Sequence, residues 1–146
     1  MNASDSERVS TLLIALSKKY VTPAFSESAA TALLLSMAPD SIDENRSNGF
    51  QYHVAEISGQ LVGVIGIKNN ECVYHLFVAE DYQRQGIAGQ LWQVAKAACM
   101  AAGNKGEFTV NSSLYAQGIY EKLGFVALSA PQERNGVVFV PMKYMQ

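Results

Sequence analysis

The chain has 146 residues, about the length of one domain, and we expect a single domain over residues 1–146. Hydrophobic residues make up 49% of it and charged residues 16%, a composition that excludes a mainly disordered chain. The net charge of −2 and the pI near 5.6 argue against a nucleic-acid-binding or anionic-membrane-binding protein, because such proteins depend on clustered Lys and Arg.

The cysteines and the first residues predict the cofactor class and the compartment. Cys72 and Cys99 form no CxxC pair and have no histidine at ligand spacing, so we expect no metal site. Residues 1–10 lack the basic and apolar regions of a secretory signal, and no run of about 18 apolar residues occurs. The sequence therefore predicts a cytoplasmic protein that does not interact with membranes.

The first third of the chain predicts helices. Apolar residues recur at helical spacing over residues 4–19, and Pro23 ends this element. A second helix is expected over residues 26–37, and residues 40–48 suit a turn or a short helix.

From residue 50 the pattern changes to strands. The segments FQYHVAEI and LVGVIGI flank Ser58-Gly59-Gln60 and predict a β-hairpin, and CVYHLFV predicts a third strand. Pro141 is expected to place the final strand at a sheet edge or at a bulge. The remaining predicted elements are helices over 86–102 and 113–122 and strands over 107–111, 125–128 and 137–144. This order predicts a mixed sheet with helices, in the α/β or α+β class.

The most informative segment is V-A-E-D-Y-Q-R-Q-G-I-A-G-Q-L, residues 78–91. Gly86 opens a helix there, so the first amides have no intrahelical acceptor and the helix dipole adds partial positive charge. Gly86 and Gly89 leave room for close approach and Arg84 adds charge, which suits a phosphate or pyrophosphate. The segment is neither a Walker A loop nor a dinucleotide fingerprint. Gly86–Gly89 also matches the GXXG loop of KH RNA-binding domains, which the acidic chain and the preceding strand disfavour.

Two segments resemble the signature motifs of the GNAT superfamily of N-acetyltransferases. Gln83-Arg84-Gln85-Gly86-Ile87-Ala88 resembles Q/R-x-x-G-x-G/A, and Ser113 through Phe125 resembles N-x-x-A-x-x-x-Y-x-x-x-G-F. One predicted helix and one predicted strand separate them, as in that superfamily, and the resemblance covers about residues 50–144. It implies an α/β (α+β) fold with a mixed, mostly antiparallel central sheet, a splayed parallel pair of strands and flanking helices.

The resemblance implies acetyl-CoA as cosubstrate, held where the strands over 72–78 and 107–111 splay apart. Its pantetheine arm would bond to main chain near Leu76, Phe77 and Val78, in the manner of an added strand. Ser113 stands where the family has asparagine, so either Ser113 or Asn111 would hold the pantetheine. The pyrophosphate would lie on the amides of Gln83, Arg84, Gln85, Gly86, Ile87, Ala88 and Gly89.

The resemblance also implies that Tyr120 is the general acid, which would donate to the thiolate that leaves during acyl transfer. A main-chain N–H near Phe77 or Val78 would polarise the thioester carbonyl. The alternative for Tyr120 is ordinary core packing. Cys72 or Tyr74 stands where some members place a carboxylate base, which leaves a water chain and several side chains as candidates. Those side chains are Glu71, His75, Glu56 and His53.

The sequence thus predicts an N-acetyltransferase that moves an acetyl group from acetyl-CoA to an amine. The alternative is a non-catalytic acyl-CoA-binding sensor. We expect a small free amine as the acceptor, no nucleic-acid partner and no metal, and the resemblance also allows a homodimer. The residues expected to wall the acceptor groove are Tyr20, Phe25, the acidic cluster Asp40–Glu44, Tyr52 and Arg134.

Overall fold

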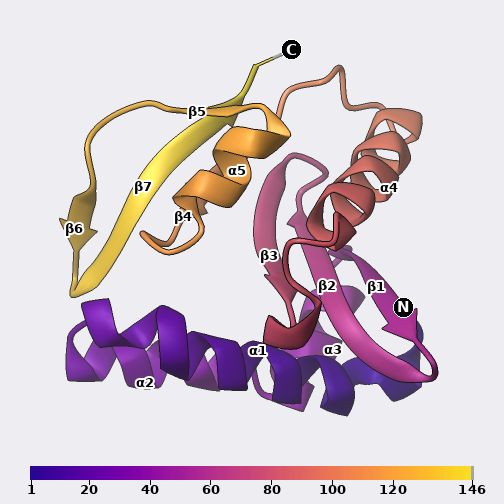
Figure 1. The fold of residues 1–146 in the computed structure, drawn as a ribbon, viewed down its shortest axis with the longest axis horizontal. Helices are drawn as coiled ribbons and strands as arrows, with labels where there is room; N and C mark the ends of the chain where they lie inside the picture. Colours follow the sequence, from indigo (N-terminus) through magenta and orange to yellow (C-terminus); the bar gives the residue numbers. More distant parts are fainter. Residues whose placement is uncertain (146) are drawn as a thin grey trace.

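A computed structural model describes residues 1–145, in which a seven-stranded sheet has the order β1-β2-β3-β4-β7-β5 with β6 paired to β7 (Figure 1). The helices are α1 (Ser6–Tyr20), α2 (Glu27–Leu35), α3 (Pro39–Ser47), α4 (Ile87–Ala101) and α5 (Gln117–Leu123). The strands are β1 (Gln51–Ile57), β2 (Gln60–Lys68), β3 (Cys72–Val78), β4 (Thr109–Ser112), β5 (Phe125–Ala127), β6 (Gln132–Arg134) and β7 (Val137–Tyr144). Every strand pair is antiparallel except β3 with β4, which confirms the predicted fold class.

Helices cover both faces of the sheet. Figure 1 shows α1, α2 and α3 along one side and α4 with α5 along the other. Each layer has its own apolar core: Trp92 and Phe108 belong to the core beneath α4, and Leu13 and Ile42 belong to the core between the sheet and α1 with α3. None of the helices within residues 1–145 combines the length and the apolar character needed to cross a bilayer.

The parallel strands β3 and β4 pair over a very short length. Only Cys72 with Thr109 and Val73 with Val110 are in register, and beyond them the two strands separate. The separation begins beside a bulge, because the register of β3 against β2 shifts so that Tyr74 has no partner. A bulge bends its strand, which accounts for the divergence at this point.

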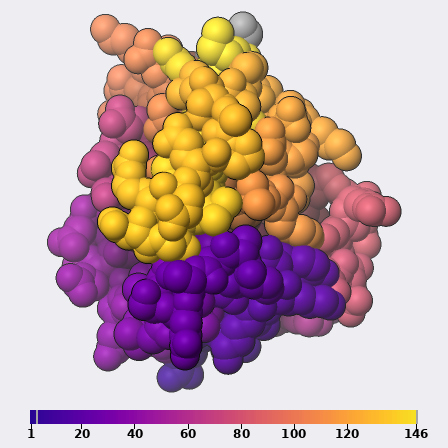
Figure 2. Space-filling view, turned by 90° about the vertical axis from the view of Figure 1, so that its left-hand side faces the viewer, coloured from indigo at the N-terminus to yellow at the C-terminus, as the bar shows by residue number. Residues whose placement is uncertain are grey.

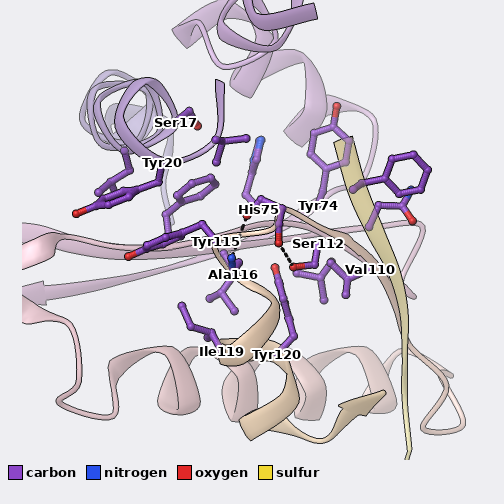
Figure 3. Close-up of a pocket in the computed structure, with 18 of the residues that line it drawn as sticks. Ser17, Tyr20, Tyr74, His75, Val110, Ser112, Tyr115, Ala116, Ile119 and Tyr120 are labelled. Carbon is purple, nitrogen blue, oxygen red and sulfur yellow. Dashed lines mark hydrogen bonds between the residues drawn. The ribbon is translucent and has the colours of Figure 1, made fainter. Parts of the chain in front are cut away.

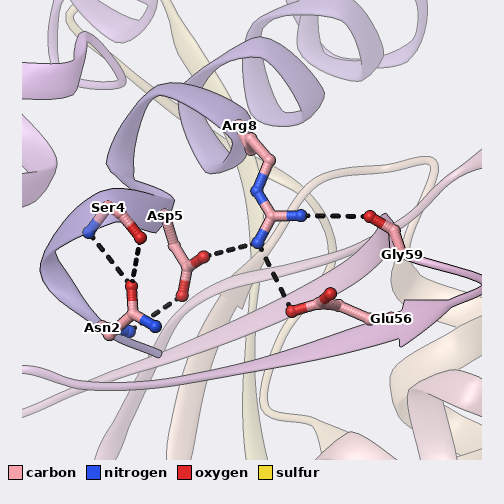
Figure 4. Close-up of polar contacts among 6 residues, drawn as sticks. All are labelled: Asn2, Ser4, Asp5, Arg8, Glu56 and Gly59. Carbon is pink, nitrogen blue, oxygen red and sulfur yellow. Dashed lines mark hydrogen bonds and ion pairs between the residues drawn. The ribbon is translucent and has the colours of Figure 1, made fainter.

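Polar contacts fasten the start of α1 to the β1–β2 hairpin (Figure 4). The Arg8 guanidinium donates to Asp5 Oδ1 at 2.6 Å, to Glu56 Oε1 at 3.4 Å and to the carbonyl of Gly59 at 3.4 Å. Glu56 is therefore part of a surface contact that positions α1 on the sheet.

The structure differs from the sequence-based predictions in three respects. The helix expected from Ser113 begins only at Gln117, because Ser113 Oγ accepts the N–H of Ala116 and holds a turn there. The short strand β6 was not predicted. The expectation that Pro141 marks an edge or a bulge is wrong, since β7 lies between β4 and β5. Pro141 is tolerated because it faces Leu128, just past the end of β5. Its carbonyl accepts the Leu128 N–H, and the sheet loses only the one hydrogen bond that the missing proline N–H would have donated.

Candidate active site

A cavity of about 1320 Å³ occupies the gap between β3 and β4 and extends beneath α1 and α2 (Figure 3). Tyr120 and every residue predicted to bind the cosubstrate line this cavity, except Gln85. The side chain of Gln85 instead donates to the carbonyl of Asp81, at 3.4 Å. Local sequence motifs thus lie around one space although the chain segments that carry them are far apart.

The turn before α4 presents a row of main-chain donors. Arg84 and Gly86 both adopt positive φ angles, 65° and 81°, and Gly86 is the N-cap of α4. No N–H from Arg84 to Gly89 has an acceptor within residues 1–145. Left-handed residues within such a turn make an anion-binding concavity, and the helix N-terminus adds to it.

Main-chain groups of β3 also face the gap. The N–H of Ala79 donates to the carbonyl of Val62 at 2.8 Å. In an antiparallel pair, alternate residues direct their main-chain N–H and C=O toward the partner strand, so Phe77, two residues before Ala79, also directs its main chain toward β2. Leu76 and Val78 therefore direct theirs toward the gap. The Val78 carbonyl accepts from Gln83 Nε2 at 2.9 Å, which leaves the Val78 N–H and both groups of Leu76 available.

The opposite edge of the gap is formed by Asn111 and Ser113. The N–H of Thr109 donates to the carbonyl of Glu71 at 3.0 Å, so by alternation Asn111 also directs its main chain toward the gap. The Asn111 side chain has no hydrogen-bond partner within residues 1–145, whereas Ser113 Oγ is an acceptor for Ala116. Of the two, Asn111 has the greater unused hydrogen-bonding capacity.

Tyr120 projects from α5 into the cavity. Its ring packs edge-on against Phe125, with centroids 5.5 Å apart, and the residue is only 5% exposed. Its hydroxyl is directed toward the gap (Figure 3) and has no hydrogen-bond partner within residues 1–145. Burial, with a smaller effect of the nearby Cys72 thiol, raises the pKa of Tyr120 above that of free tyrosine. The hydroxyl therefore keeps its proton at neutral pH.

Among the four candidate base side chains, only His75 lines the cavity. Its Nδ1 lies 3.1 Å from the Tyr52 hydroxyl, which in turn accepts from Asn45 Nδ2 at 3.1 Å. This Tyr52 ring fits because residue 66 is glycine: a Cβ there would lie 2.5 Å from Tyr52 Cε1. Burial lowers the pKa of His75 to about 3, so the imidazole is neutral at physiological pH and is a weak base.

An aromatic contact that the sequence did not indicate spans the mouth of the gap. Tyr20 at the end of α1 stacks on Tyr115, with centroids 4.1 Å apart, and Tyr115 donates to Gln83 Oε1 at 2.9 Å. Lys19 Nζ lies 2.7 Å from Glu80 Oε1 and fastens α1 to the turn after β3. Tyr115 follows no periodic pattern because it lies in a loop, so only the tertiary structure shows its role.

Residues 21–145 match the family model described as the acetyltransferase (GNAT) domain. The chain belongs to the GNAT family of acetyltransferases. This assignment replaces the KH alternative for the glycine-bearing turn. No curated protein matches the sequence of this GNAT chain.

Solved structures share this GNAT fold at low sequence identity. A GCN5-related N-acetyltransferase from Rhodopseudomonas palustris is 21% identical, with a TM-score of 0.79 over 100% of this chain and 92% of that chain. The PaiA N-acetyltransferase of Thermoplasma acidophilum, in complex with coenzyme A, is 17% identical, with a TM-score of 0.78 over 100% of this chain and 96% of that chain. A GNAT acetyltransferase of Staphylococcus aureus is 18% identical, with a TM-score of 0.74 over 99% of this chain and 94% of that chain.

The expected acidic wall of the acceptor groove is absent from the cavity of this GNAT domain. No residue of the Asp40–Glu44 cluster lines it, and neither does Tyr52. Asp43 accepts a hydrogen bond from Ser6 Oγ and so joins α3 to α1. The cluster was misassigned because it precedes β1 in the sequence, whereas the groove is walled by α1, α2 and β7. Tyr20, Phe25 and Arg134 do line the cavity, as expected.

Proposed function

We propose that this GNAT domain transfers the acetyl group of acetyl-CoA to a small primary amine by direct attack, without a covalent enzyme intermediate. The observation that carries this proposal is the Tyr120 hydroxyl, protonated and unpartnered within residues 1–145, facing the gap between two open strand edges. Family membership supports the acyl-transfer class. A cavity of about 1320 Å³ has room for a pantetheine arm and a small acceptor together.

The residues around the gap fit the parts of the cosubstrate. The unpartnered amides of Arg84 to Gly89 suit a pyrophosphate, because each can donate to an anionic oxygen. The free main-chain groups of Leu76 suit the amides of a pantetheine arm, as does the Asn111 side chain. We assign Phe77 to packing, since its main chain faces β2.

The proposed chemistry assigns each polar group a role. Acetyl-CoA supplies a thioester, whose C–S bond breaks as the C–N bond to the amine forms. The Val78 N–H donates to the carbonyl oxygen as negative charge develops on it. The Tyr120 hydroxyl donates a hydrogen bond to the sulfur as negative charge develops on it. The sulfur leaves as the CoA thiolate, whose thiol has a pKa of about 8.5, and then takes a proton from solvent. The amine proton passes to water, because the cavity lining within residues 1–145 contains no carboxylate and His75 is a weak base.

The test is an assay of CoA release from acetyl-CoA with a panel of small amines, in which mass spectrometry identifies the acetylated product. We expect amine-dependent release above the rate of thioester hydrolysis. A protein that binds acetyl-CoA but releases no CoA with any amine would be the non-catalytic sensor, and the proposed activity would be wrong.

The pH dependence of the reaction follows from the state of His75. Its pKa of about 3 lies below the assay range, so His75 neither gains nor loses a proton between pH 5 and 9. The titrating group is then the acceptor ammonium, with a pKa of about 10 for an alkylamine. We expect kcat/KM for an alkylamine acceptor to rise about tenfold per pH unit from pH 6 to 9 at saturating acetyl-CoA. A plateau that begins between pH 6 and 8 would instead show a protein base.

A further inference from the structure

The charged residues that line the cavity, among the residues that the structure describes, are all cationic. They are Lys68, Arg84, Lys122 and Arg134, and none of the chain's 13 Asp and Glu residues contributes to the lining. None of the four forms an ion pair within residues 1–145. The cavity of this acidic protein is thus suited to anionic groups, and it offers no carboxylate to a polycation.

The four cations divide between the two faces of the sheet. Arg84 belongs to the turn before α4 and Lys122 to α5, so both lie on the side where the phosphates of the cosubstrate are proposed to bind. Lys68 lies over the ring of Tyr74, at 5.9 Å, and is on the opposite face, because Tyr74 packs edge-on against Phe50 of the core between the sheet and α1 with α3. β6, which carries Arg134, lies above α2 in Figure 1. The Arg134 guanidinium lies over Phe139, which alternates along β7 with Val140 and Met142 of the core beneath α4, so Arg134 is on the opposite face. The cosubstrate phosphates therefore do not account for Arg134.

The β6–β7 hairpin holds Arg134 in a defined place. The hairpin rests on α2, because the N–H of Ser26 donates to the carbonyl of Gly136 at 3.0 Å. Figure 2 shows the hairpin, in yellow, packed directly on the N-terminal helices, in indigo. The Arg134 guanidinium lies 5.6 Å from the ring of Phe139, which brings its charge back along β7 toward the gap. Phe139 is next to Val140, which pairs with Ser112 at the end of β4.

The surface between Arg134 and the gap is mostly apolar. We call this part of the cavity, between the N-terminal helices and β7, the acceptor compartment. Its apolar residues are Phe25, Ala29, Leu33, Met37, Val138 and Phe139, and Ser17, Ser28 and Asn135 are the polar residues among them. Apolar walls stabilise an apolar body by removing its surface from water. A guanidinium beside them binds a carboxylate in a bidentate arrangement.

We propose that the acceptor is an amine separated from a carboxylate by an apolar chain, as in an ω-amino acid, and that Arg134 binds this carboxylate. The inference rests on the proposed acetyltransferase function and names the class of its substrate. The amine is then directed toward the gap and Tyr120 while the carboxylate stays on the hairpin. Polyamines are poor acceptors, because no carboxylate of the described cavity lining pairs with their charges.

The experiment compares amino acids with the amines that remain when their carboxylate is removed. The pairs are 6-aminohexanoate with pentylamine and 8-aminooctanoate with heptylamine, and spermidine is added as a polycation. We expect Arg134→Gln to lower kcat/KM for each amino acid by about 10- to 100-fold, the range of a hydrogen-bonded charge pair, and to lower it far less for the matching amine. Comparing variant with wild type for each compound cancels differences in intrinsic amine reactivity.

Two further variants control for the fold and for charge alone. Arg134→Lys keeps the charge but loses the bidentate geometry, and we expect it to restore part of the amino acid activity. Arg46→Gln removes an arginine of α3 that does not line the cavity, and we expect wild-type rates with both members of each pair.

The outcomes separate this inference from the proposed function. An equal loss for both members of a pair, or a wild-type preference for spermidine or the decarboxylated amines, would overturn the role of Arg134 and leave the acetyltransferase function standing. If no compound releases CoA, both fail. A thermal shift with CoA in the same samples would then show whether the cosubstrate site itself exists.

Discussion

Replacing Tyr120 by phenylalanine is expected to lower kcat by about 10²- to 10⁴-fold and to change KM for acetyl-CoA little. The hydroxyl acts on charge that develops only as the thiolate leaves, so its loss affects the transition state more than the bound ground state. The aromatic ring keeps its edge-on packing against Phe125 in the variant, and the hydroxyl has no partner in residues 1–145 whose loss would destabilise the fold. Steady-state kinetics with both substrates varied provide the measurement.

Tyr144 provides the matched control for this substitution. Its ring lies 5.4 Å from the same Phe125, its hydroxyl accepts from Lys96 at 3.0 Å, and it does not line the cavity. We expect Tyr144→Phe to retain turnover. Turnover close to wild type in Tyr120→Phe would return that residue to the core-packing interpretation.

Replacing Gly86 by glutamate is expected to abolish stabilisation by CoA. A ligand at 100 times its Kd stabilises the native state by about 2.7 kcal/mol, which thermal denaturation detects readily. Glutamate places a carboxylate beside the amides proposed to bind pyrophosphate, and like charge repels the ligand. The positive φ of 81° adds backbone strain of about 1–2 kcal/mol, so the variant's own melting temperature is the reference for its CoA shift.

Gly103→Glu separates the effect on the ligand from the effect on the backbone. Gly103 has a φ of 106°, a Cβ added there would meet no atom within 4 Å, and the residue does not line the cavity. It should suffer similar strain while it keeps the full CoA shift. An undiminished CoA shift in Gly86→Glu would refute the placement of pyrophosphate on this turn.

Local chemistry made much of this molecule predictable. The β1–β2 hairpin follows from β-rich segments on both sides of Ser58-Gly59, and both of these residues adopt positive φ. The turn at Gly86 follows from glycine between a strand and an apolar helical pattern, because a helix start leaves its amides unpaired whatever surrounds it. The position of Tyr120 was predictable because Tyr120 and the C-cap Gly124 belong to one short helix, α5, which fixes the distance between them.

Other features depend on contacts between segments distant in the chain. The pairing of Ala79 with Val62 decides that Leu76 and Val78, and not Phe77, direct their main chains toward the gap, and a shift of one residue would reverse this. Pro141 proved compatible with an interior strand because β5 ends beside it, which no local pattern encodes. The cationic lining is likewise a tertiary property, since four basic residues from separate elements meet at one cavity while every acidic side chain within residues 1–145 faces elsewhere.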